Sequence, residues 1–373
     1  MLPEYAGLVS IAQPVRAAAA RHDIPRSMRA LVKERPGPGM ALREVPVPAI
    51  GPNDVLIRVL KAGICGTDAH IWAWDPWSQN RLRPPLVIGH EFMGVVAAIG
   101  AAVRSVSVGE RVSAEGHIPD GTCFLCRSGQ AHICAAVKVI GVDRDGCFAD
   151  YIAMPESNVW KLDPGVPDEW AAIFDPFGNA VHTVAVGDVS LKSVLITGAG
   201  SIGLMAVGVA AAAGASKIIA VDPNPHKLAL ARVMGAHVVL DSAAPNLREA
   251  IRSETGGNGP DVLLEMSGNP VAFDSGLAAL RNGGRAAVLG IPGGNVTFDL
   301  AEHLVLKGIT VAGVFGRRMW ETWYQMQALV SLGRIDLKPV ITHVVPFERF
   351  EECFTTLKRS EAVKIVLDLT SGA

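Results

Sequence analysis

The 373-residue sequence predicts an α/β protein of two domains, a β-rich one followed by one built on a doubly wound parallel sheet. Residues 28–177 contain short β-branched runs separated by Gly and Pro, which is typical of antiparallel strands. Beyond about residue 179, short apolar strands recur at intervals of roughly 20 residues with helix-like segments between them. A glycine-rich turn joins the first of these strands to the first helix, as in nucleotide-binding sheets.

The first 27 residues differ from the rest, since they lack a periodic apolar pattern and contain four successive alanines. They also lack the continuous apolar stretch that a secretory signal needs. We interpret residues 1–27 as an N-terminal extension, or as the product of a start codon placed too early. A transit peptide is the weaker alternative, because Glu4 and Asp23 dilute the positive charge.

Four runs in residues 28–177 are expected to be strands: 54–60, 95–99, 111–114 and 148–154. In the second half the expected strands are 194–197, 217–221, 237–240, 261–265 and 285–289, with helices at 227–234 and 271–280. A last helix, 322–332, and a final pair of strands are too short for a third domain, so we expect them to return to the first. The predicted division is therefore 28–177 with 321–373, and 178–320.

Composition limits the partners and the compartment. Lys plus Arg (34) nearly balances Asp plus Glu (36), so no large field attracts nucleic acid or an anionic membrane. Residues 193–216 carry no charge, but their five glycines and their β-branched and Ala-rich halves favour a buried strand and a packed helix over a membrane span. The six cysteines form no regular disulfide pattern, which fits a reducing, cytoplasmic location.

The segment Gly198-Ala-Gly200-Ser-Ile202-Gly203 matches G-x-G-x-x-G, and Asp222 ends the next expected strand. Gly198 would form the tight turn, Gly200 would admit a pyrophosphate, and Gly203 would allow close packing of the helix on the strand. Asp222 would bind the adenosine ribose hydroxyls and favour NAD over NADP. The alternative is a glycine turn that only packs a helix on a sheet. Further cofactor contacts are expected from Ile202, Lys227, Leu289, Gly290, Ile291 and Val314.

Two groups of sulfur, nitrogen and oxygen ligands indicate two zinc sites. The compact group follows the pattern D-x2-C-x2-C-x7-C and comprises Asp120, Cys123, Cys126 and Cys134. The other group draws on distant segments, as catalytic sites do: Cys65, with Thr67 and His70 after it, and the pair His90-Glu91. Cys65 and His90 would hold the metal, with Glu91 or Asp175 completing the sphere, unless Glu91 lies outside it.

The pattern G-H-E-x2-G-x5-G-x2-V, from Gly89 to Val103, resembles the zinc-dependent medium-chain dehydrogenase/reductase family, and the resemblance covers essentially everything after Met28. It implies a GroES-like β-rich catalytic domain, a Rossmann domain and often a homotetramer. It also implies that Thr67, a cofactor ribose hydroxyl and His70 relay a proton to solvent. The sequence departs from the family at Asp120, where a cysteine is usual, so this lobe either holds zinc with a Cys3Asp set or leaves it labile or unoccupied.

Four further segments resemble the members of that family that oxidise the C3 hydroxyl of L-threonine to 2-amino-3-ketobutyrate: residues 72–79, 115–117, 175–183 and 321–324. We therefore expect a small alcohol or amino-alcohol substrate, with His117 as a candidate substrate contact. The alternatives are a polyol or other secondary-alcohol dehydrogenase, a zinc-free quinone reductase of the same fold, and a non-catalytic cofactor-binding module.

Overall fold

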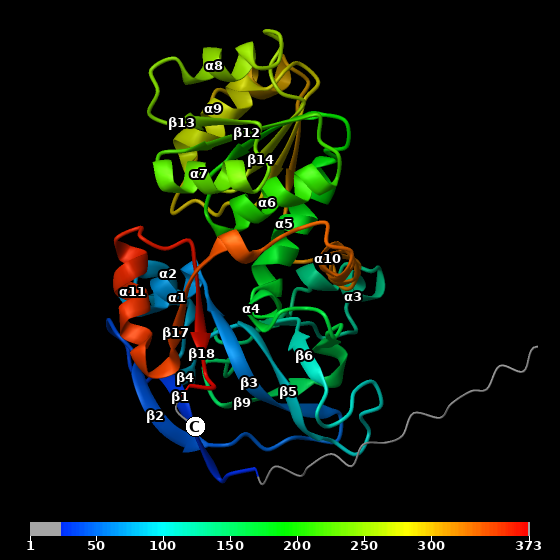
Figure 1. The fold of residues 1–373 in the computed structure, drawn as a ribbon, viewed down its shortest axis with the longest axis vertical. Coiled ribbons are helices and arrows are strands. Elements are labelled where there is room, and N and C mark those ends of the chain that lie inside the picture. The colour runs from blue at the N-terminus through cyan, green and yellow to red at the C-terminus, as the bar shows by residue number, and fades with distance from the viewer. Residues whose placement is uncertain (1–23, 372–373) are drawn as a thin grey trace, which may run out of the picture.

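The structure is a computed structural model, and it describes residues 24–371. The expected N-terminal extension therefore lies almost entirely outside the described residues. Figure 1 shows two lobes, one formed by the beginning and the end of the chain and the other by its middle.

The first lobe is built on a seven-stranded sheet in the order β10-β6-β5-β3-β18-β17, with β9 paired to β3. Its pairs are antiparallel except for β17 and β18. Valine, isoleucine and alanine dominate β3 and β5, which bury most of their residues. The strands are β3 Asp54–Ile64, β5 Glu91–Ile99, β6 Arg111–Ala114, β9 Tyr151–Pro155, β10 Val159–Lys161, β17 Ile341–Pro346 and β18 Lys364–Asp368.

Smaller elements surround this sheet and carry most of the polar candidate residues. A three-stranded sheet and a two-stranded ribbon comprise β1 Ser27–Lys33, β2 Ala41–Pro46, β4 Leu86–Val87, β7 His117–Ile118 and β8 Lys138–Val139. The helices are α1 Gly66–Ala73, α2 Pro76–Arg81, α3 Phe124–Arg127, α4 Asp168–Ala171 and α11 Phe350–Lys358. Single 3-10 turns lie at Ala131–Ile133, Glu156–Asn158, Lys338–Val340 and Phe347–Arg349.

The second lobe holds a six-stranded parallel sheet in the order β13-β12-β11-β14-β15-β16. The order reverses between β11 and β14, and ligands of such sheets bind at this reversal. The strands are β11 Ser193–Thr197, β12 Lys217–Asp222, β13 Val238–Asp241, β14 Val262–Glu265, β15 Arg285–Val288 and β16 Thr310–Gly313. The helices are α5 Phe174–Gly187, α6 Ser201–Ala212, α7 Pro225–Val233, α8 Leu247–Ser253 and α9 Pro270–Ala279, with a π-helical turn at Ala301–Val305. The last long helix, α10 Glu321–Ser331, packs against α5 and lies beside the first lobe (Figure 1).

Both faces of the parallel sheet are covered, as its strand composition requires. On β11, Val194 and Ile196 face a core shared with α5 and α6, whereas Leu195 faces a core shared with α8 and α9. The uncharged stretch 193–216 is thus β11 followed by the packed helix α6. None of the helices in residues 24–371 combines the length and apolarity that a bilayer crossing requires.

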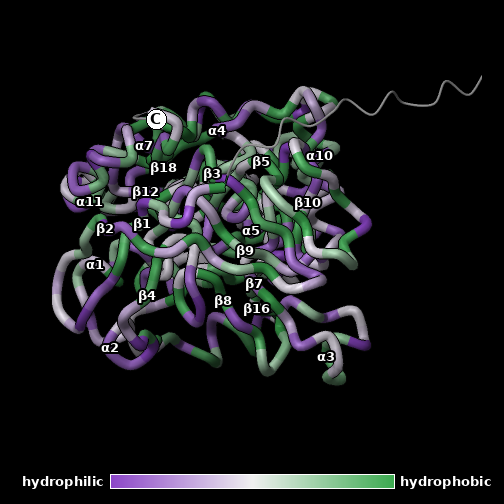
Figure 2. Tube along the Cα trace, turned by 90° about the horizontal axis from the view of Figure 1, so that it is seen from below, coloured by the Kyte–Doolittle hydropathy of each residue, from purple (hydrophilic) through white to green (hydrophobic). Residues whose placement is uncertain are grey.

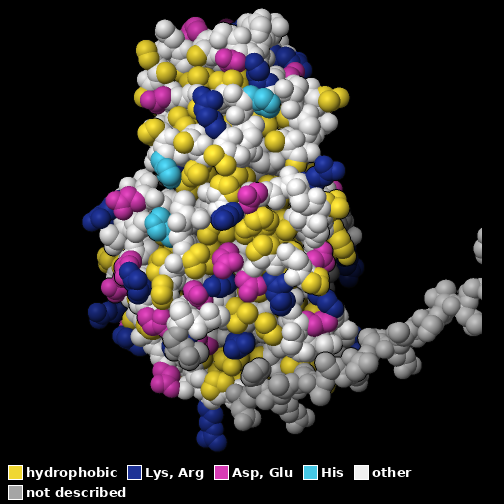
Figure 3. Space-filling view, viewed as in Figure 1, with side chains coloured by type: hydrophobic (Ala, Val, Ile, Leu, Met, Phe, Trp, Pro, Cys, Tyr) yellow, Lys and Arg dark blue, Asp and Glu magenta, His cyan; other side chains and the backbone are white. Residues whose placement is uncertain are grey.

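The predicted α/β architecture is confirmed, and the predicted strands and helices agree with the observed ones within a few residues. The end of the chain pairs with its beginning, because β18 lies between β3 and β17. On the face shown in Figure 3, acidic and basic side chains are interspersed.

Candidate functional site

Cys65, His90 and Glu91 come together, although Cys65 lies far from the other two in the sequence. One ligand atom of each lies within 4.8 Å of those of the others. Cys65 is the N-cap of α1, and the pair His90-Glu91 leads into β5 beside it. Gly89 makes this approach possible, since it has a φ of 91° and a Cβ there would meet the Phe148 ring at 2.3 Å.

Asp68 is a member of this site that the sequence analysis missed. Its carboxylate is fully buried on α1, with Oδ2 accepting from the Cys65 N–H at 2.9 Å and Oδ1 lying 3.8 Å from His90 Nδ1. Among the described residues, neither Asp68 Oδ1 nor His90 Nδ1 has a hydrogen-bond partner. Burial alone would lower the pKa of His90, but the charges of Cys65 and Asp68 raise it to about 10. The site is therefore electronegative, and its sulfur, imidazole and carboxylate donors fit zinc.

Glu91 is engaged by a buried lysine. Lys364 Nζ, on β18, lies 2.9 and 2.8 Å from the two Glu91 carboxylate oxygens and donates to the Ile64 carbonyl. Both side chains are essentially inaccessible to solvent. Burial would lower the pKa of Lys364, but the charges of Glu91 and Cys65 raise it, so the lysine is a cation. In this arrangement Glu91 is a neighbour of the ligand set, which favours the alternative in which it lies outside the metal sphere.

Asp175 lies in the first turn of α5 and does not join the group of Cys65, His90 and Glu91. Its Oδ2 accepts from Arg317 Nη1 at 2.8 Å. Its carboxylate still lies near His90, because a Cβ on Gly116 would be 3.6 Å from Asp175 Oδ2 and 3.5 Å from the His90 carbonyl oxygen.

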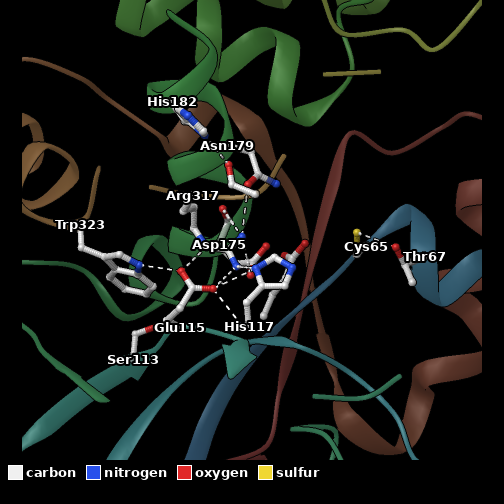
Figure 4. A network of polar contacts seen from close by, with 12 residues as sticks. Cys65, Thr67, Ser113, Glu115, His117, Asp175, Asn179, His182, Arg317 and Trp323 are labelled. Atoms are coloured by element: carbon white, nitrogen blue, oxygen red, sulfur yellow. Dashed lines mark hydrogen bonds and ion pairs between the residues drawn. The ribbon is translucent and has the colours of Figure 1, made fainter. Parts of the chain in front are cut away.

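Arg317 is the centre of a buried polar network, which we call the Arg317 network: Arg317, Glu115, His117, Trp323 and Asp175 (Figure 4). Arg317 follows β16 and donates through Nε to Glu115 Oε2 at 2.8 Å and through Nη2 to Glu115 Oε1. Trp323 Nε1 donates to Glu115 at 2.9 Å, and His117 Nδ1 lies 2.9 Å from Arg317 Nη2. Burial would raise the pKa of Glu115, but Arg317 holds it well below its ordinary range. His117 and Asp175 are predicted site residues, whereas Arg317 carries no signal in the sequence that marks it as one.

Thr67 and His70 follow Cys65 along α1. Thr67 Oγ1 lies 3.7 Å from Cys65 Sγ, and Figure 4 shows the two side chains together, apart from the Arg317 network. His70 is exposed, and its Nδ1 lies 2.6 Å from Asp75 Oδ2.

The second ligand group is compact, as its spacing predicts: single ligand atoms of Asp120, Cys123, Cys126 and Cys134 lie within 4.8 Å of one another. Cys123 Sγ lies 3.5 Å from Cys126 Sγ and 3.8 Å from Cys134 Sγ, and within residues 24–371 all six cysteines are free. Backbone hydrogen bonds from Cys123 and Thr122 lower the pKa of Asp120 to about 2, so it is an anion. The four donors fit zinc. Figure 2 shows the loop around α3 extending from the body of the protein.

The glycine loop lies at the carboxyl end of β11, where the strand order reverses. Gly198 has a φ of 88°, and a Cβ on Gly203 would lie 1.8 Å from the Gly198 carbonyl oxygen. Asp222 accepts from the Ala199 N–H at 2.8 Å, so the carboxylate also fastens the loop to β12. Of the other predicted cofactor contacts, Ile202 lies on α6, Lys227 on α7, Leu289, Gly290 and Ile291 directly after β15, and Val314 directly after β16.

Comparison with known proteins gives a consistent result over most of the chain. Residues 51–164 match the alcohol dehydrogenase GroES-like domain and residues 201–331 match zinc-binding dehydrogenase. The chain is 48% identical over 342 residues to the L-threonine 3-dehydrogenase of Symbiobacterium thermophilum, covering 91% of this chain and 97% of that protein.

Two solved structures extend this likeness to the fold. An alcohol dehydrogenase from Thermus sp. ATN1 has a TM-score of 0.85 at 32% identity, covering 91% and 99% of the two chains. An alcohol dehydrogenase from E. coli CFT073 complexed with NADH has a TM-score of 0.85 at 26% identity, covering 92% and 100%.

Proposed function

The chain belongs to the zinc-binding alcohol dehydrogenase family, and we propose that it oxidises the C3 hydroxyl of L-threonine with NAD⁺, giving 2-amino-3-ketobutyrate. The observation that carries the substrate assignment is the near-complete, high-identity likeness to an L-threonine 3-dehydrogenase. The alternative is a sibling activity on a polyol or another secondary alcohol, which would use the same metal and cofactor residues.

Cys65 and His90 would hold the catalytic zinc, and Asp68 would orient His90 from the side of Nδ1. Zinc bound here supplies a Lewis acid that lowers the pKa of an alcohol hydroxyl toward neutrality. Glu91 and Asp175 are the candidate further ligands, and each is paired with a buried cation in this structure. Lys364 contacts both carboxylate oxygens of Glu91, whereas Arg317 pairs with Asp175 through Oδ2.

The residues of the chain supply orientation and a path for the proton. Thr67 presents its hydroxyl next to Cys65, where it can accept the proton of the substrate alcohol. His117 is 12% exposed at its side chain and is held by Glu115 and Arg317, so its ring can orient the substrate. His70, one turn further along α1, is exposed and can pass the proton to water.

NAD⁺ would bind across the glycine loop, with its pyrophosphate at the N-terminus of α6. Asp222 would accept from the ribose hydroxyls and disfavour a 2′-phosphate. We also propose contacts from Ile202, Lys227, Leu289, Gly290, Ile291 and Val314, all of which lie on or directly after elements of the parallel sheet layer.

A second zinc would bind Asp120, Cys123, Cys126 and Cys134 and contribute to stability without taking part in turnover. Free thiols at all six cysteines, each of which lies in the described part of the chain, support a cytoplasmic location. We keep the division into residues 28–177 with 321–373, and 178–320, as a proposal that the return of β17 and β18 to the first sheet supports.

We also propose a homotetramer, with β16 in one of its contacts. Among the described residues no strand pairs with the outer edge of β16, and Val311 on it is 40% exposed. Val305, Leu306 and Phe315, which flank the strand, are 64%, 68% and 46% exposed. An open edge with apolar neighbours suits pairing with a second copy of the chain. Sedimentation at micromolar concentration would test the assembly.

A substrate panel tests the activity: initial rates of NAD⁺ reduction with L-threonine, sorbitol, 2,3-butanediol and simple alcohols. We expect the highest kcat/KM with L-threonine, and a higher value with sorbitol or butanediol would replace the assignment by the sibling activity. Cys65→Ala should abolish oxidation of every alcohol. Full activity of Cys65→Ala would exclude zinc chemistry at this site.

A further inference from the structure

We propose that Asp75 is a positioning residue for proton release, because it fixes the tautomer of His70 that leaves Nε2 free to accept a proton. Nothing in the family likeness assigns a role to Asp75. The inference rests on the proposed oxidation of an alcohol, which must deliver one proton to water for each substrate molecule.

Helix α1 connects the buried ligand site with the surface. Cys65 caps its N-terminus, Thr67 lies in its first turn, and His70 follows three residues after Thr67. Residues three apart on a helix lie on the same side, so the hydroxyl and the imidazole are neighbours along one face. The Thr67 hydroxyl contacts Cys65, whereas the His70 side chain is 60% exposed. The helix thus arranges two groups that can carry protons between the interior and solvent.

The contact between His70 and Asp75 determines where the imidazole carries its hydrogen. His70 Nδ1 and Asp75 Oδ2 are 2.6 Å apart. An ionised carboxylate can only accept, so Nδ1 must donate, and in the neutral ring Nε2 is then an acceptor. Burial would raise the pKa of Asp75, but hydrogen bonds from Ser78 and His70 lower it, so Asp75 is ionised at neutral pH.

The local structure holds Asp75 in place. Asp75 is the N-cap of α2, and its Oδ1 accepts from the Ser78 N–H at 2.9 Å while Oδ2 faces His70. The Trp77 ring, on α2, lies 6.3 Å from the His70 ring. The nearby cations have other partners: Lys33 Nζ binds the Ile71 carbonyl at 3.0 Å, and Arg81 pairs with Asp143 at 2.6 Å. Asp75 is thus the carboxylate that directly contacts the ring.

Oxidation of the substrate alcohol releases one hydride and one proton. The C3–H bond breaks, and hydrogen leaves with its electron pair to reduce NAD⁺. The O–H bond also breaks, and the carbonyl forms. The hydroxyl proton leaves through the relay of which Thr67 is the first member and is accepted at His70 Nε2, while the Asp75 carboxylate stabilises the resulting imidazolium until Nε2 releases the proton to water.

Asp75→Asn separates the effect of Asp75 on the His70 tautomer from its role as the N-cap of α2. Asparagine is as good an N-cap as aspartate, so its Oδ1 retains the bond from Ser78. Its amide nitrogen, however, donates toward Nδ1 and forces the hydrogen of the neutral imidazole onto Nε2, which can then no longer accept a proton. The alternative is that the pair only closes the turn between α1 and α2, where the Asp75 N–H reaches the His70 carbonyl at 3.4 Å.

Two measurements on the full-length holoenzyme distinguish these alternatives. In long-range ¹H–¹⁵N spectra of histidine-labelled protein, the His70 resonances, assigned by their loss in His70→Gln, should change from the Nδ1–H to the Nε2–H pattern in Asp75→Asn. In single turnovers with a pH indicator, proton release should slow about a hundredfold, the lower end of what general-base assistance contributes. Added imidazole should restore release in Asp75→Asn and leave wild type unchanged.

Asp274→Asn is the matched control, because Asp274 forms a similar pair with His303, 2.7 Å apart, on α9 of the other lobe. It should leave the His70 spectrum and proton release at their wild-type values. The proposal is overturned if Asp75→Asn keeps the Nδ1–H tautomer, or if it releases protons at the wild-type rate without any response to imidazole. If the wild-type protein oxidises no alcohol, both the proposed function and the role of Asp75 are refuted. That result differs from equal turnover of wild type and Asp75→Asn, which refutes only the role of Asp75.

Discussion

Replacement of Arg317 by methionine should strongly destabilise the protein, because one buried cation serves two buried carboxylates. The Arg317 side chain is 1% exposed and lies 2.8 Å from both Glu115 Oε2 and Asp175 Oδ2. It also donates to Asn179 Oδ1 at 3.2 Å. Methionine has a comparable length and fills much of the same space, so the change chiefly removes charge and hydrogen bonds.

The expected loss of stability arises because Glu115 and Asp175 remain buried without their cation. Removing one partner of a buried ion pair costs about 3–5 kcal/mol, since the other charge is left without compensation. Total stabilities are about 5–15 kcal/mol, so the loss is a large part of the free energy of unfolding. Burial would lower the pKa of Arg317, but Asp175 and Glu115 raise it above its ordinary value, which agrees with a strongly favoured cation.

Urea unfolding of the zinc-loaded protein, followed by tryptophan fluorescence, measures this loss. The adjacent residue provides the control: Arg318 pairs with Glu321 at 3.0 Å, but their side chains are 50% and 52% exposed. Arg318→Met should therefore change the free energy of unfolding by less than about 1 kcal/mol. Combining Arg317→Met with Glu115→Gln removes one of the two buried charges that are left unpaired. The double variant should therefore be more stable than Arg317→Met alone.

Two results would refute this reasoning. One is an Arg317→Met protein within about 1 kcal/mol of wild type, which would mean that water or rearrangement compensates the carboxylates. The other is a double variant no more stable than Arg317→Met, which would show that the charge of Glu115 is not the origin of the cost.

Purified protein should contain close to two zinc ions per chain by elemental analysis. Asp120→Cys should slow zinc loss to a chelator, because thiolate is the softer ligand. An unchanged rate of zinc loss would argue against Asp120 as a ligand. Gly203→Ala should weaken NAD⁺ binding at least about tenfold in a fluorescence titration. The added Cβ would lie 1.8 Å from the Gly198 carbonyl oxygen and must displace the glycine loop. An unchanged affinity for NAD⁺ would contradict this close packing. Burial lowers the pKa of His182 below its ordinary 6.5, so the unfolded chain binds the proton more readily and stability should fall as pH decreases below about 6.5. His182→Gln should reduce that fall in melting temperature between pH 7 and 5, and an unaltered slope would assign it to other groups.

The elements whose signals are local could be predicted from the sequence. The glycine loop follows β11 because its three glycines and the acid after β12 lie within one β-α-β unit. The compact ligand group was also recognisable from its short spacings, and the other group from the types of its residues, since cysteine, histidine and carboxylate are typical zinc ligands. Both groups do converge in space.

Partners far apart in the sequence could not be predicted. Lys364 reaches Glu91 across 273 residues, and Arg317 reaches Glu115 across 202. A buried lysine or arginine resembles a surface one in sequence, because its partner is known only once the sheets are assembled. Asp68 could not be recognised for another reason: it is an acid in the first turn of α1, a common position for such a residue in any helix.

The insertion of β18 between β3 and β17 has a consequence for how the protein is made. The ribosome releases residues 178–320 as one uninterrupted stretch that can fold while synthesis continues, whereas β3 pairs with a strand whose Lys364 follows Ile64 by 300 residues. Lys364 lies on that same strand, so the first lobe becomes complete only after the second lobe has been synthesised. A chain interrupted before β18 would thus contain a finished nucleotide-binding half attached to an unfinished catalytic one.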